Sequence, residues 1–342
     1  MNERPSVLII NTGGTIGMML DQKTGALKPV DFDNLFDLVP TLRLFNYQID
    51  NYCFDPLMDS SNMNPGFWAD LAAIIEKKYE LYDGFVVMHG SDTMAYTASG
   101  LSFMLQNLNK PVILTGSQLP LGMIRTDGRV NLITAVEIAA AKEDDTPIVP
   151  EVCICFENQL FRGNRTHKFN AQNFQAFRSF NYPPLANAGV VLEYNRAAIQ
   201  KPNFKKLKVY QKFDPNIGIL KLLPGISQSF VEAILTTKDL KAIILETYGS
   251  GNAPDDDWFL TLLRDAISGG KIIYNVTQCQ VGKVEMGKYE TSIRLKDIGV
   301  ISGGDITTEA AVAKLMFLLG NFSDRDQINN LLMVSLVGEM TT

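Results

Sequence analysis

The sequence is poor in the residues that build metal sites and disulfide frameworks. Its 342 residues include two histidines and four cysteines. The cysteines are Cys53, Cys153, Cys155 and Cys279. They form no C-x-x-C pair, so neither zinc nor another metal is predicted. Cys153 and Cys155 lie two residues apart in an apolar run and would share one face of a strand, which favours buried free thiols in a reducing compartment.

Positive charge is not in excess either. The chain has 31 lysines and arginines against 37 aspartates and glutamates, a net charge of −6, so a nucleic-acid partner is not predicted. No apolar run approaches the roughly 20 residues that a membrane helix needs. The first residues, MNERPS, lack the apolar core of a signal peptide. These observations predict a cytoplasmic protein that binds neither nucleic acid nor a membrane.

What the sequence does contain is an alternation of strand-like and helix-like segments. Hydrophobic residues make up 46% of the chain, enough for a large core. The strand-like runs cover residues 7–11, 84–89, 112–115, 152–156, 217–223, 242–246 and 271–276. Between the first two, Asn64 can cap a helix that starts at Pro65. This β-α-β-α order predicts parallel sheets covered by helices.

We therefore predict two α/β domains. Residues 1–190 would form a larger N-terminal domain with a mostly parallel sheet flanked by helices, and it would carry most of the active site. Residues 215–342 would form a smaller C-terminal α/β domain. Between them, residues 191–214 lose the alternation and carry five lysines. A solvated linker is the favoured interpretation of this stretch, ahead of an anion-binding patch.

Polar segments follow the apolar runs of the N-terminal half. They are TGGT, DSS, GSDT and GSQ, and their first residues are Thr12, Asp59, Gly90 and Gly116. In parallel sheets, ligands bind beyond the carboxyl ends of the strands. These four segments are therefore expected to converge on one rim of one sheet.

Two kinds of chemistry suit a glycine pair at the end of a strand. Gly13, Gly14 and Gly17 give G-G-x-x-G, a poor match to the phosphate-binding patterns. The alternative is a nucleophile: the hydroxyl of Thr15 follows a backbone without Cβ atoms, which a substrate can approach closely. A threonine hydroxyl then needs a base.

The source of that base is open on residue types alone. His89 ends an apolar strand, where a hydrogen-bonded core histidine is the more typical outcome. A lysine desolvated near Ser91 and Asp92 can lose its proton at neutral pH. The segment FRGNRTHKF supplies Arg162, Arg165 and Lys168, although on sequence alone a solvated basic turn is favoured.

A small polar ligand can be held at the same rim. Ser60 and backbone N–H groups suit an α-carboxylate, and Asp92 can accept from an α-ammonium group. A helix-capping turn before Pro65 explains the segment Asp59-Ser60-Ser61 equally well.

Taken together, the motifs identify a family. TGGTIG, PLMDSS, HGSDTMAYTAS, TGSQLPL, RTDGRVNL and RGNRTHK resemble those of the bacterial type I (cytoplasmic) L-asparaginases. TYGSGNAP and VTQCQVGKVEMGKYE continue the resemblance into the second half of the chain. It implies hydrolysis of L-asparagine to L-aspartate and ammonia, two α/β domains, a homodimer or a homotetramer built as a dimer of dimers, and no metal or organic cofactor.

The resemblance also implies roles for individual residues. Thr15 matches the threonine nucleophile that forms an acyl-enzyme. Ser91, Asp92 and Lys168 match the family's Thr-Asp-Lys triad. The substrate-binding set that it implies is Gly14, Asp59, Ser60, Ser61, Ser91 and Asp92. Backbone N–H groups near Gly14 and Ser91 would stabilise the oxyanion.

The sequence departs from the family pattern at three places. Ser91 stands where threonine is usual, which keeps the hydroxyl but loses the β-branch that restricts χ1. The segment DQKTGALKPV, which starts at Asp21, has no counterpart of the family's loop tyrosine, so the proton acceptor for Thr15 is open. Glu246 replaces an arginine of the candidate effector site, which otherwise includes His167 and Cys279. An acid there would repel an amino-acid carboxylate, so activation by asparagine is predicted to be lost or altered.

Two other functions remain open at this point. One is an amidase that also accepts glutamine or acts on a misacylated tRNA, against which the acidic charge argues. The other is a non-catalytic regulator that binds an amino acid. Retention of Thr15, Ser91, Asp92 and Lys168 together favours the enzyme, because a regulator needs neither both hydroxyls nor the lysine.

Overall fold

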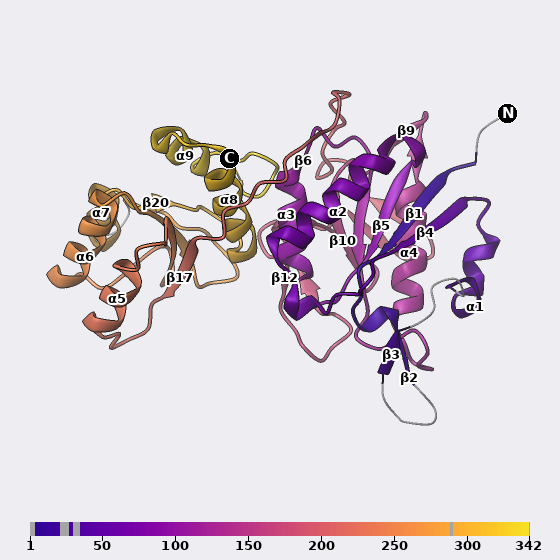
Figure 1. Cartoon of the computed structure of the whole chain (residues 1–342), viewed down its shortest axis with the longest axis horizontal. Coiled ribbons are helices and arrows are strands. Elements are labelled where there is room, and N and C mark those ends of the chain that lie inside the picture. The colour runs from indigo at the N-terminus through magenta and orange to yellow at the C-terminus, as the bar shows by residue number, and fades with distance from the viewer. Residues whose placement is uncertain (1–3, 21–26, 30–34, 288–289, 342) are drawn as a thin grey trace. The chain divides into compact units, whose positions relative to one another are not determined.

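The computed structural model describes residues 4–20, 27–29, 35–287 and 290–341 of the protein. The chain divides into two compact units, Met1–Gln211 and Lys212–Thr342, called here the N-terminal and C-terminal domains. Both are α/β domains, as the alternation of segments predicts (Figure 1). None of the described helices has the length and apolar character needed to cross a membrane.

An eight-stranded sheet forms the centre of the N-terminal domain, as far as the structure describes it. In spatial order its strands are β15 (Leu192–Tyr194), β14 (Ala186–Ala188), β11 (Gln159–Arg162), β10 (Val152–Phe156), β7 (Val112–Thr115), β5 (Gly84–Met88), β1 (Ser6–Asn11) and β4 (Gln48–Cys53). From β4 to β10 neighbouring strands are parallel, and from β10 to β15 they are antiparallel. The prediction of a mostly parallel sheet is confirmed, with an antiparallel extension at one side.

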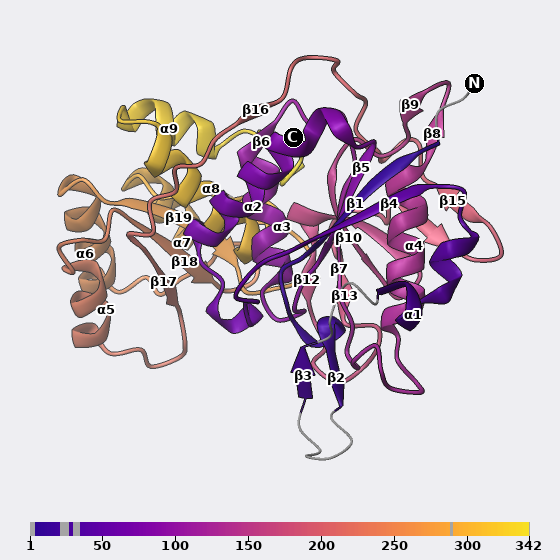
Figure 2. The same cartoon turned by 45° about the vertical axis from the view of Figure 1, so that its right-hand side comes forward.

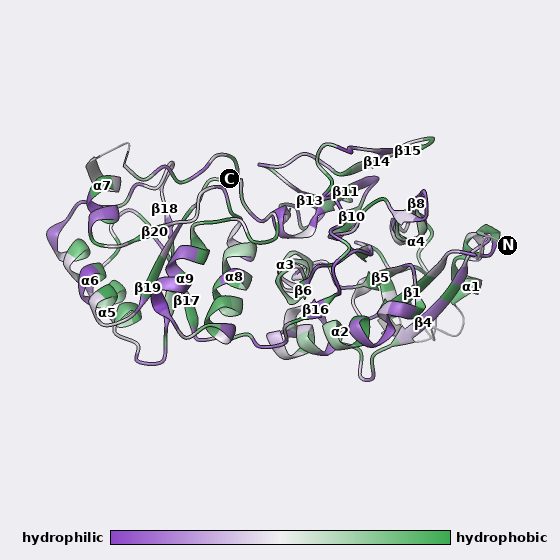
Figure 3. Cartoon of the chain, turned by 90° about the horizontal axis from the view of Figure 1, so that it is seen from above, coloured by the Kyte–Doolittle hydropathy of each residue, from purple (hydrophilic) through white to green (hydrophobic). Residues whose placement is uncertain are grey.

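Helices cover both faces of this sheet. Helices α2 (Pro65–Lys78) and α3 (Met94–Met104) lie on one face, and α1 (Leu35–Leu38) and α4 (Gly128–Ala140) on the other (Figures 1 and 3). Val7 and Ile9 of β1 pack with Val136 of α4 in one buried cluster. Alternate residues of a strand face opposite sides, so the other residues of β1 face α2 and α3.

Helix α2 begins as the sequence predicts. The side chain of Asn64 accepts a hydrogen bond from the backbone N–H of Phe67 at 3.2 Å, and Pro65 occupies the first helical position. An Asn cap satisfies an N–H that has no partner inside the helix, and proline has no N–H to lose there. This fixes the chain direction immediately after the segment Asp59-Ser60-Ser61.

The described part of the N-terminal domain also contains short two-stranded sheets. They are β2 (Met18–Leu20) with β3 (Leu27–Pro29), β6 (Leu105–Gln106) with β16 (Lys208–Val209), β8 (Lys142–Glu143) with β9 (Thr146–Pro147), and β12 (His167–Lys168) with β13 (Phe177–Arg178). The β6–β16 pair holds part of the lysine-rich stretch against this domain. The buried residues Ala198 and Ile199 of the same stretch belong to its core.

The C-terminal domain has its own parallel sheet. Its strands, in order, are β17 (Ile217–Lys221), β18 (Ala242–Thr247), β19 (Ile272–Thr277) and β20 (Ile301–Ser302). Helices α5 (Gln228–Leu235), α6 (Asp257–Ser268) and α7 (Glu290–Asp297) lie on one face of the sheet, and α8 (Thr308–Asn321) and α9 (Arg325–Leu332) on the other (Figures 1 and 2). Helix α6 buries Phe259, Leu260 and Leu263, and its ribbon carries both hydrophobic and hydrophilic residues (Figure 3). The predicted α/β domain is confirmed.

The last residues of the chain are held by a buried ion pair. Lys314 of α8 lies 2.8 Å from a carboxylate oxygen of Glu339, and both side chains are fully buried. The remaining N–H groups of the ammonium donate to the carbonyls of Leu332 and Val334. Two buried charges persist only when paired and hydrogen-bonded, so this cluster fixes the end of the chain to α8.

Candidate active site

Two glycines bring the end of β1 close to its neighbours. Gly13 and Gly14 have φ values of +119° and +85°, a region that side chains with a Cβ rarely adopt. A Cβ on Gly13 would overlap the carbonyl of Met58, and one on Gly14 would overlap the backbone of Gly90. Only glycine therefore lets the loops after β1 and β5 touch and place Thr15 beside them.

A pocket of about 270 Å³ opens at the carboxyl ends of β1, β5 and β7. Its lining residues are Gly14, Thr15, Met18, Asp59, Ser60, Gly90, Ser91, Asp92, Gln118, Lys168 and Ala171. All four expected catalytic residues line this one pocket, and so do five of the six expected substrate-binding residues, two of which are also expected to be catalytic. Ser61 lies beside it as the partner of Asp59. The polar segments after the strands thus converge on one rim of the sheet.

Lys168 is the centre of the polar contacts in this pocket. Its Nζ donates to the hydroxyl of Ser91 at 2.8 Å and to a carboxylate oxygen of Asp92 at 2.5 Å. The Lys168 side chain is 15% exposed, whereas Asp92 is 68% exposed. The lysine is therefore largely shielded from water while its carboxylate partner is open to solvent. A hydroxyl, a lysine and a carboxylate in this order can move a proton to or from a reacting group.

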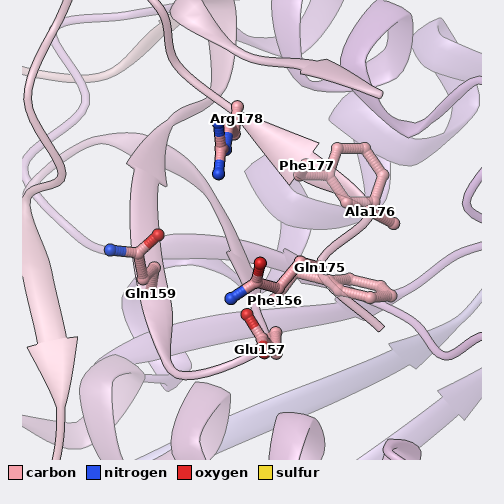
Figure 4. A pocket seen from close by; sticks show the side chains of 7 residues that line it. All are labelled: Phe156, Glu157, Gln159, Gln175, Ala176, Phe177 and Arg178. Atoms are coloured by element: carbon pink, nitrogen blue, oxygen red, sulfur yellow. The ribbon is translucent and has the colours of Figure 1, made fainter. Parts of the chain in front are cut away.

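The hairpin of β12 and β13 positions Lys168. In this hairpin Lys168 pairs with Phe177, and His167 pairs with Arg178. Figure 4 shows a second, smaller pocket against β13, of about 40 Å³, lined by Phe156, Glu157, Gln159, Gln175, Ala176, Phe177 and Arg178. Its volume suits a few water molecules and not an amino acid. The hairpin therefore packs over a small polar cavity, and the aromatic contact of Phe156 with Phe177, with ring centroids 4.9 Å apart, anchors it.

The segment after β4 forms another wall of the pocket. The carboxylate of Asp59 accepts from the backbone N–H of Ser61 at 2.8 Å and from its hydroxyl at 2.7 Å. These two hydrogen bonds lower the pKa of Asp59, so this carboxylate is ionised at neutral pH. The hydroxyl of Thr93 donates to the carbonyl of Ser60 at 2.7 Å and ties this wall to the Ser91–Asp92 loop.

His89 has no access to the pocket. Its side chain is completely buried, with Nδ1 2.7 Å from the carbonyl of Gly90 and Nε2 2.9 Å from the hydroxyl of Thr97. Burial lowers the pKa of His89 to about 4, so the ring is neutral. The interpretation of His89 as a hydrogen-bonded core residue is confirmed, and the general base must be sought elsewhere.

The prediction of a solvated basic turn at FRGNRTHKF was wrong. Arg162 and Arg165 are only 6% and 2% exposed. Arg162 forms an ion pair with Glu151 at 2.6 Å, and its guanidinium lies 4.4 Å from the centre of the Tyr182 ring. Burial favours loss of the proton, but the hydrogen bonds and charge of Glu151 outweigh it and raise the pKa of Arg162. Arg162 is buried because Glu151, eleven positions earlier, and Tyr182, twenty positions later, lie beside it. No local sequence pattern indicates either contact.

The four cysteines separate into two kinds. Cys153 and Cys155 on β10 are buried free thiols, as predicted, and Cys53 and Cys279 are exposed. Burial raises the pKa of both β10 thiols, that of Cys155 to about 12. Thiols with raised pKa values are poor nucleophiles, so these two serve as core residues.

The candidate effector residues lie on both domains. His167 is in β12 of the N-terminal domain, beside Lys168. Glu246 lies at the carboxyl end of β18, where its carboxylate accepts from the Thr308 hydroxyl at 2.7 Å and lies 3.2 Å from Lys221 Nζ. Cys279 follows β19 and is exposed. The acidic side chain of Glu246 is thus already paired within its own domain.

Several residues of the pocket wall are not among the site residues predicted individually from the sequence. Gln118 and Ala171 both line it, as do Met18 and Gly90. Gln118 carried a detectable signal, because it belongs to the segment GSQ that follows β7. Ala171 carried none, since it reaches the pocket only through the path of the loop after Lys168. Among the described residues, no three His, Cys, Asp or Glu side chains gather as a metal site requires.

Two hydroxyls, a lysine and a carboxylate lie together at the rim of an α/β sheet, an arrangement typical of the hydrolase class. The family follows from comparison. The family model "Asparaginase, N-terminal" matches residues 6–200, and "Glutaminase/Asparaginase C-terminal domain" matches residues 216–332. The chain belongs to the L-asparaginase family.

Individual relatives agree with this assignment. L-asparaginase 1 of Escherichia coli K12 is 42% identical over 99% of both chains. The solved structure of L-asparaginase I from Vibrio cholerae is 40% identical, with a TM-score of 0.89 over 99% of this chain and all of that one. The solved structure of the thermostable L-asparaginase from Thermococcus kodakarensis is 30% identical, with a TM-score of 0.90 over 98% of this chain and 99% of that one.

Proposed function

We propose that the protein hydrolyses the side-chain amide of L-asparagine to give L-aspartate and ammonia. The observation that carries the proposal is the hydrogen-bonded group of Lys168, Ser91 and Asp92 in one pocket with Thr15. Kinship with L-asparaginases supplies the substrate class. In this proposal a pocket hydroxyl would attack the amide carbonyl and the lysine would carry the proton.

In the proposed reaction Thr15 is the nucleophile. Its oxygen attacks the amide carbon, the C–N bond breaks, and ammonia leaves with the proton that the hydroxyl releases. The resulting ester, an acyl-enzyme, is hydrolysed by water to regenerate the hydroxyl and release aspartate. Backbone N–H groups near Gly14 and Ser91 would stabilise the negative oxygen that develops in each step.

The substrate's charged ends would be held by the pocket walls. The ionised Asp59 and the exposed Asp92 would accept from the α-ammonium group. Ser60, buried at the pocket wall, would donate to the α-carboxylate. An amide side chain would then extend toward Thr15 at the end of β1.

The proton acceptor for Thr15 is proposed to be a tyrosine from elsewhere, a bound water or Lys168. The sequence from Asp21 to Val30 contains no tyrosine, and residues 21–26 lie outside the described part of the chain. Lys168 lies in the same pocket as Thr15, and its Nζ is 2.8 Å from the hydroxyl of Ser91.

The assay is ammonia release against the concentration of L-asparagine, with L-glutamine run in parallel, for the wild type and Thr15→Ala. Turnover of asparagine that the variant loses supports the proposal. Comparable turnover of glutamine would favour a broader amidase, because one extra methylene changes specificity by only about 10–200-fold. Asparagine binding with no ammonia from either amide would favour a non-catalytic regulator.

Activation by asparagine is proposed to be lost or altered. The carboxylate of Glu246 would repel a second amino-acid carboxylate, and its contacts with Thr308 and Lys221 hold it in place. A hyperbolic rate curve is expected for the wild type. A sigmoidal curve that Glu246→Ala abolishes would contradict this expectation.

From the family resemblance we propose that two or four identical chains assemble. We also propose from it that the protein is cytoplasmic. Sedimentation velocity at several protein concentrations tests the assembly. A single monomeric species at all concentrations would rule the assembly out.

A further inference from the structure

The side chain of Gln118 reaches into the active-site pocket from the loop after β7. Its amide Nε2 donates to the backbone carbonyl of Asn173 at 2.9 Å, and its Oε1 lies 3.5 Å from the hydroxyl oxygen of Ser91. Gln118 therefore bridges Ser91 to the loop that follows Lys168, and that loop contributes Ala171 to the pocket wall.

The orientation of this amide follows from the groups around it. A backbone carbonyl can only accept a hydrogen bond, so the nitrogen of the Gln118 amide must face Asn173 and its oxygen must face Ser91. The Ser91 hydroxyl already accepts from Lys168 Nζ at 2.8 Å. Its own hydrogen is therefore directed at Gln118, which leaves its lone pair for the lysine.

The backbone that carries Gln118 is held firmly. The carboxylate of Asp127 accepts from the backbone N–H of Gln118 at 3.0 and 3.1 Å and from that of Leu119 at 3.1 Å. The amide nitrogen of Asn131 donates to the carbonyl of Gly116 at 2.9 Å. A glutamine on such an anchored loop is preorganised to restrain a neighbouring hydroxyl.

We propose that Gln118 is a positioning residue that holds the hydroxyl of Ser91 in the orientation that Lys168 requires. Serine has no β-branch, so its χ1 is less restricted than that of threonine. Gln118 supplies the missing restraint from outside the side chain. The inference rests on the proposed amide hydrolysis and adds the residue that keeps the hydrogen bond from Lys168 to Ser91 aligned.

The test is a double-mutant cycle with asparagine as substrate. Gln118→Met keeps the length of the side chain and removes both polar groups, and it is measured in the wild type and in Ser91→Thr. In the wild type, kcat is expected to fall about fivefold to tenfold, the value of one hydrogen bond, with KM changed by less than about twofold. In Ser91→Thr the same change is expected to cost less than about twofold. Gln159→Met, on β11 and outside the active-site pocket, is the matched control.

A purely structural role for Gln118 gives a different result. Equal losses in both backgrounds, or no loss in either, would overturn the assignment. Absence of turnover by the wild type would instead refute the proposed function itself.

Discussion

The buried ion pair of Glu151 and Arg162 provides a quantitative test of the N-terminal core. The carboxylate accepts from Arg162 Nε at 2.6 Å and from Nη2 at 3.2 Å, and also from the backbone N–H of Gln200. The two side chains are 2% and 7% exposed, respectively. Replacing Glu151 with glutamine leaves the size of the side chain nearly unchanged. It leaves the buried guanidinium of Arg162 without its negative partner.

The expected cost is large. Removing one partner of a buried pair destabilises a protein by about 3–5 kcal/mol, because the remaining charge stays desolvated. With a urea dependence of about 3 kcal/mol per molar, the unfolding midpoint should fall by about 1–1.7 M. The matched control is Asp37→Asn. That residue pairs with Arg43 at 2.7 Å, but the two side chains are 65% and 57% exposed, and such a pair contributes at most about 1 kcal/mol.

The assay is urea unfolding followed by tryptophan fluorescence. The chain has two tryptophans, Trp68 in α2 and Trp258 in α6. In a Trp258→Phe background the signal reports the N-terminal domain alone. If Glu151→Gln shifts the midpoint no more than Asp37→Asn does, the argument from the buried pair is wrong.

Two further predictions follow from the environment of the pocket. His89 has its pKa lowered to about 4 by burial, so the unfolded chain binds more protons between pH 6.5 and 4. The contribution of the neutral His89 to the free energy of unfolding, up to about 3 kcal/mol, should therefore be lost as the pH falls through that window. When the free energy of unfolding is measured at pH 7.5 and at pH 5, the decrease should be smaller in His89→Gln than in the wild type. Gly14→Ala would force the backbone of Gly90 away, and because a misplacement of about 1 Å can cost about a hundredfold in rate, asparagine turnover should fall by about that factor. Gly189→Ala, whose Cβ would meet only an ordinary contact at 3.8 Å, should leave turnover unchanged.

The sequence predicts the parts of the fold that rest on local patterns. The strand at β1, the capped helix α2 and the parallel strands of the C-terminal domain each follow from apolar runs, caps and glycines within a few residues. The convergence of the polar segments also follows, because parallel strands end at the same rim. These features need no knowledge of distant partners.

What the sequence does not predict depends on contacts between distant residues. Strand β4 reads QIDNYC and is mostly polar and exposed, and only its pairing with β1 makes it a strand. Arg162 is buried because Glu151 and Tyr182 lie beside it. Gln118 lies in the pocket because Asp127 holds its loop. Each of these three features depends on the position of a segment that is distant in the sequence.

The most direct test of the central claim is the turnover of L-asparagine by Lys168→Met. The substitution keeps the side-chain bulk and removes the group that joins Ser91 to Asp92. The account predicts that kcat falls by about 10²–10⁴-fold, the usual contribution of a positioned acid–base group, while asparagine still binds in calorimetry. Turnover within about threefold of the wild type would contradict the assignment of the reaction to this pocket.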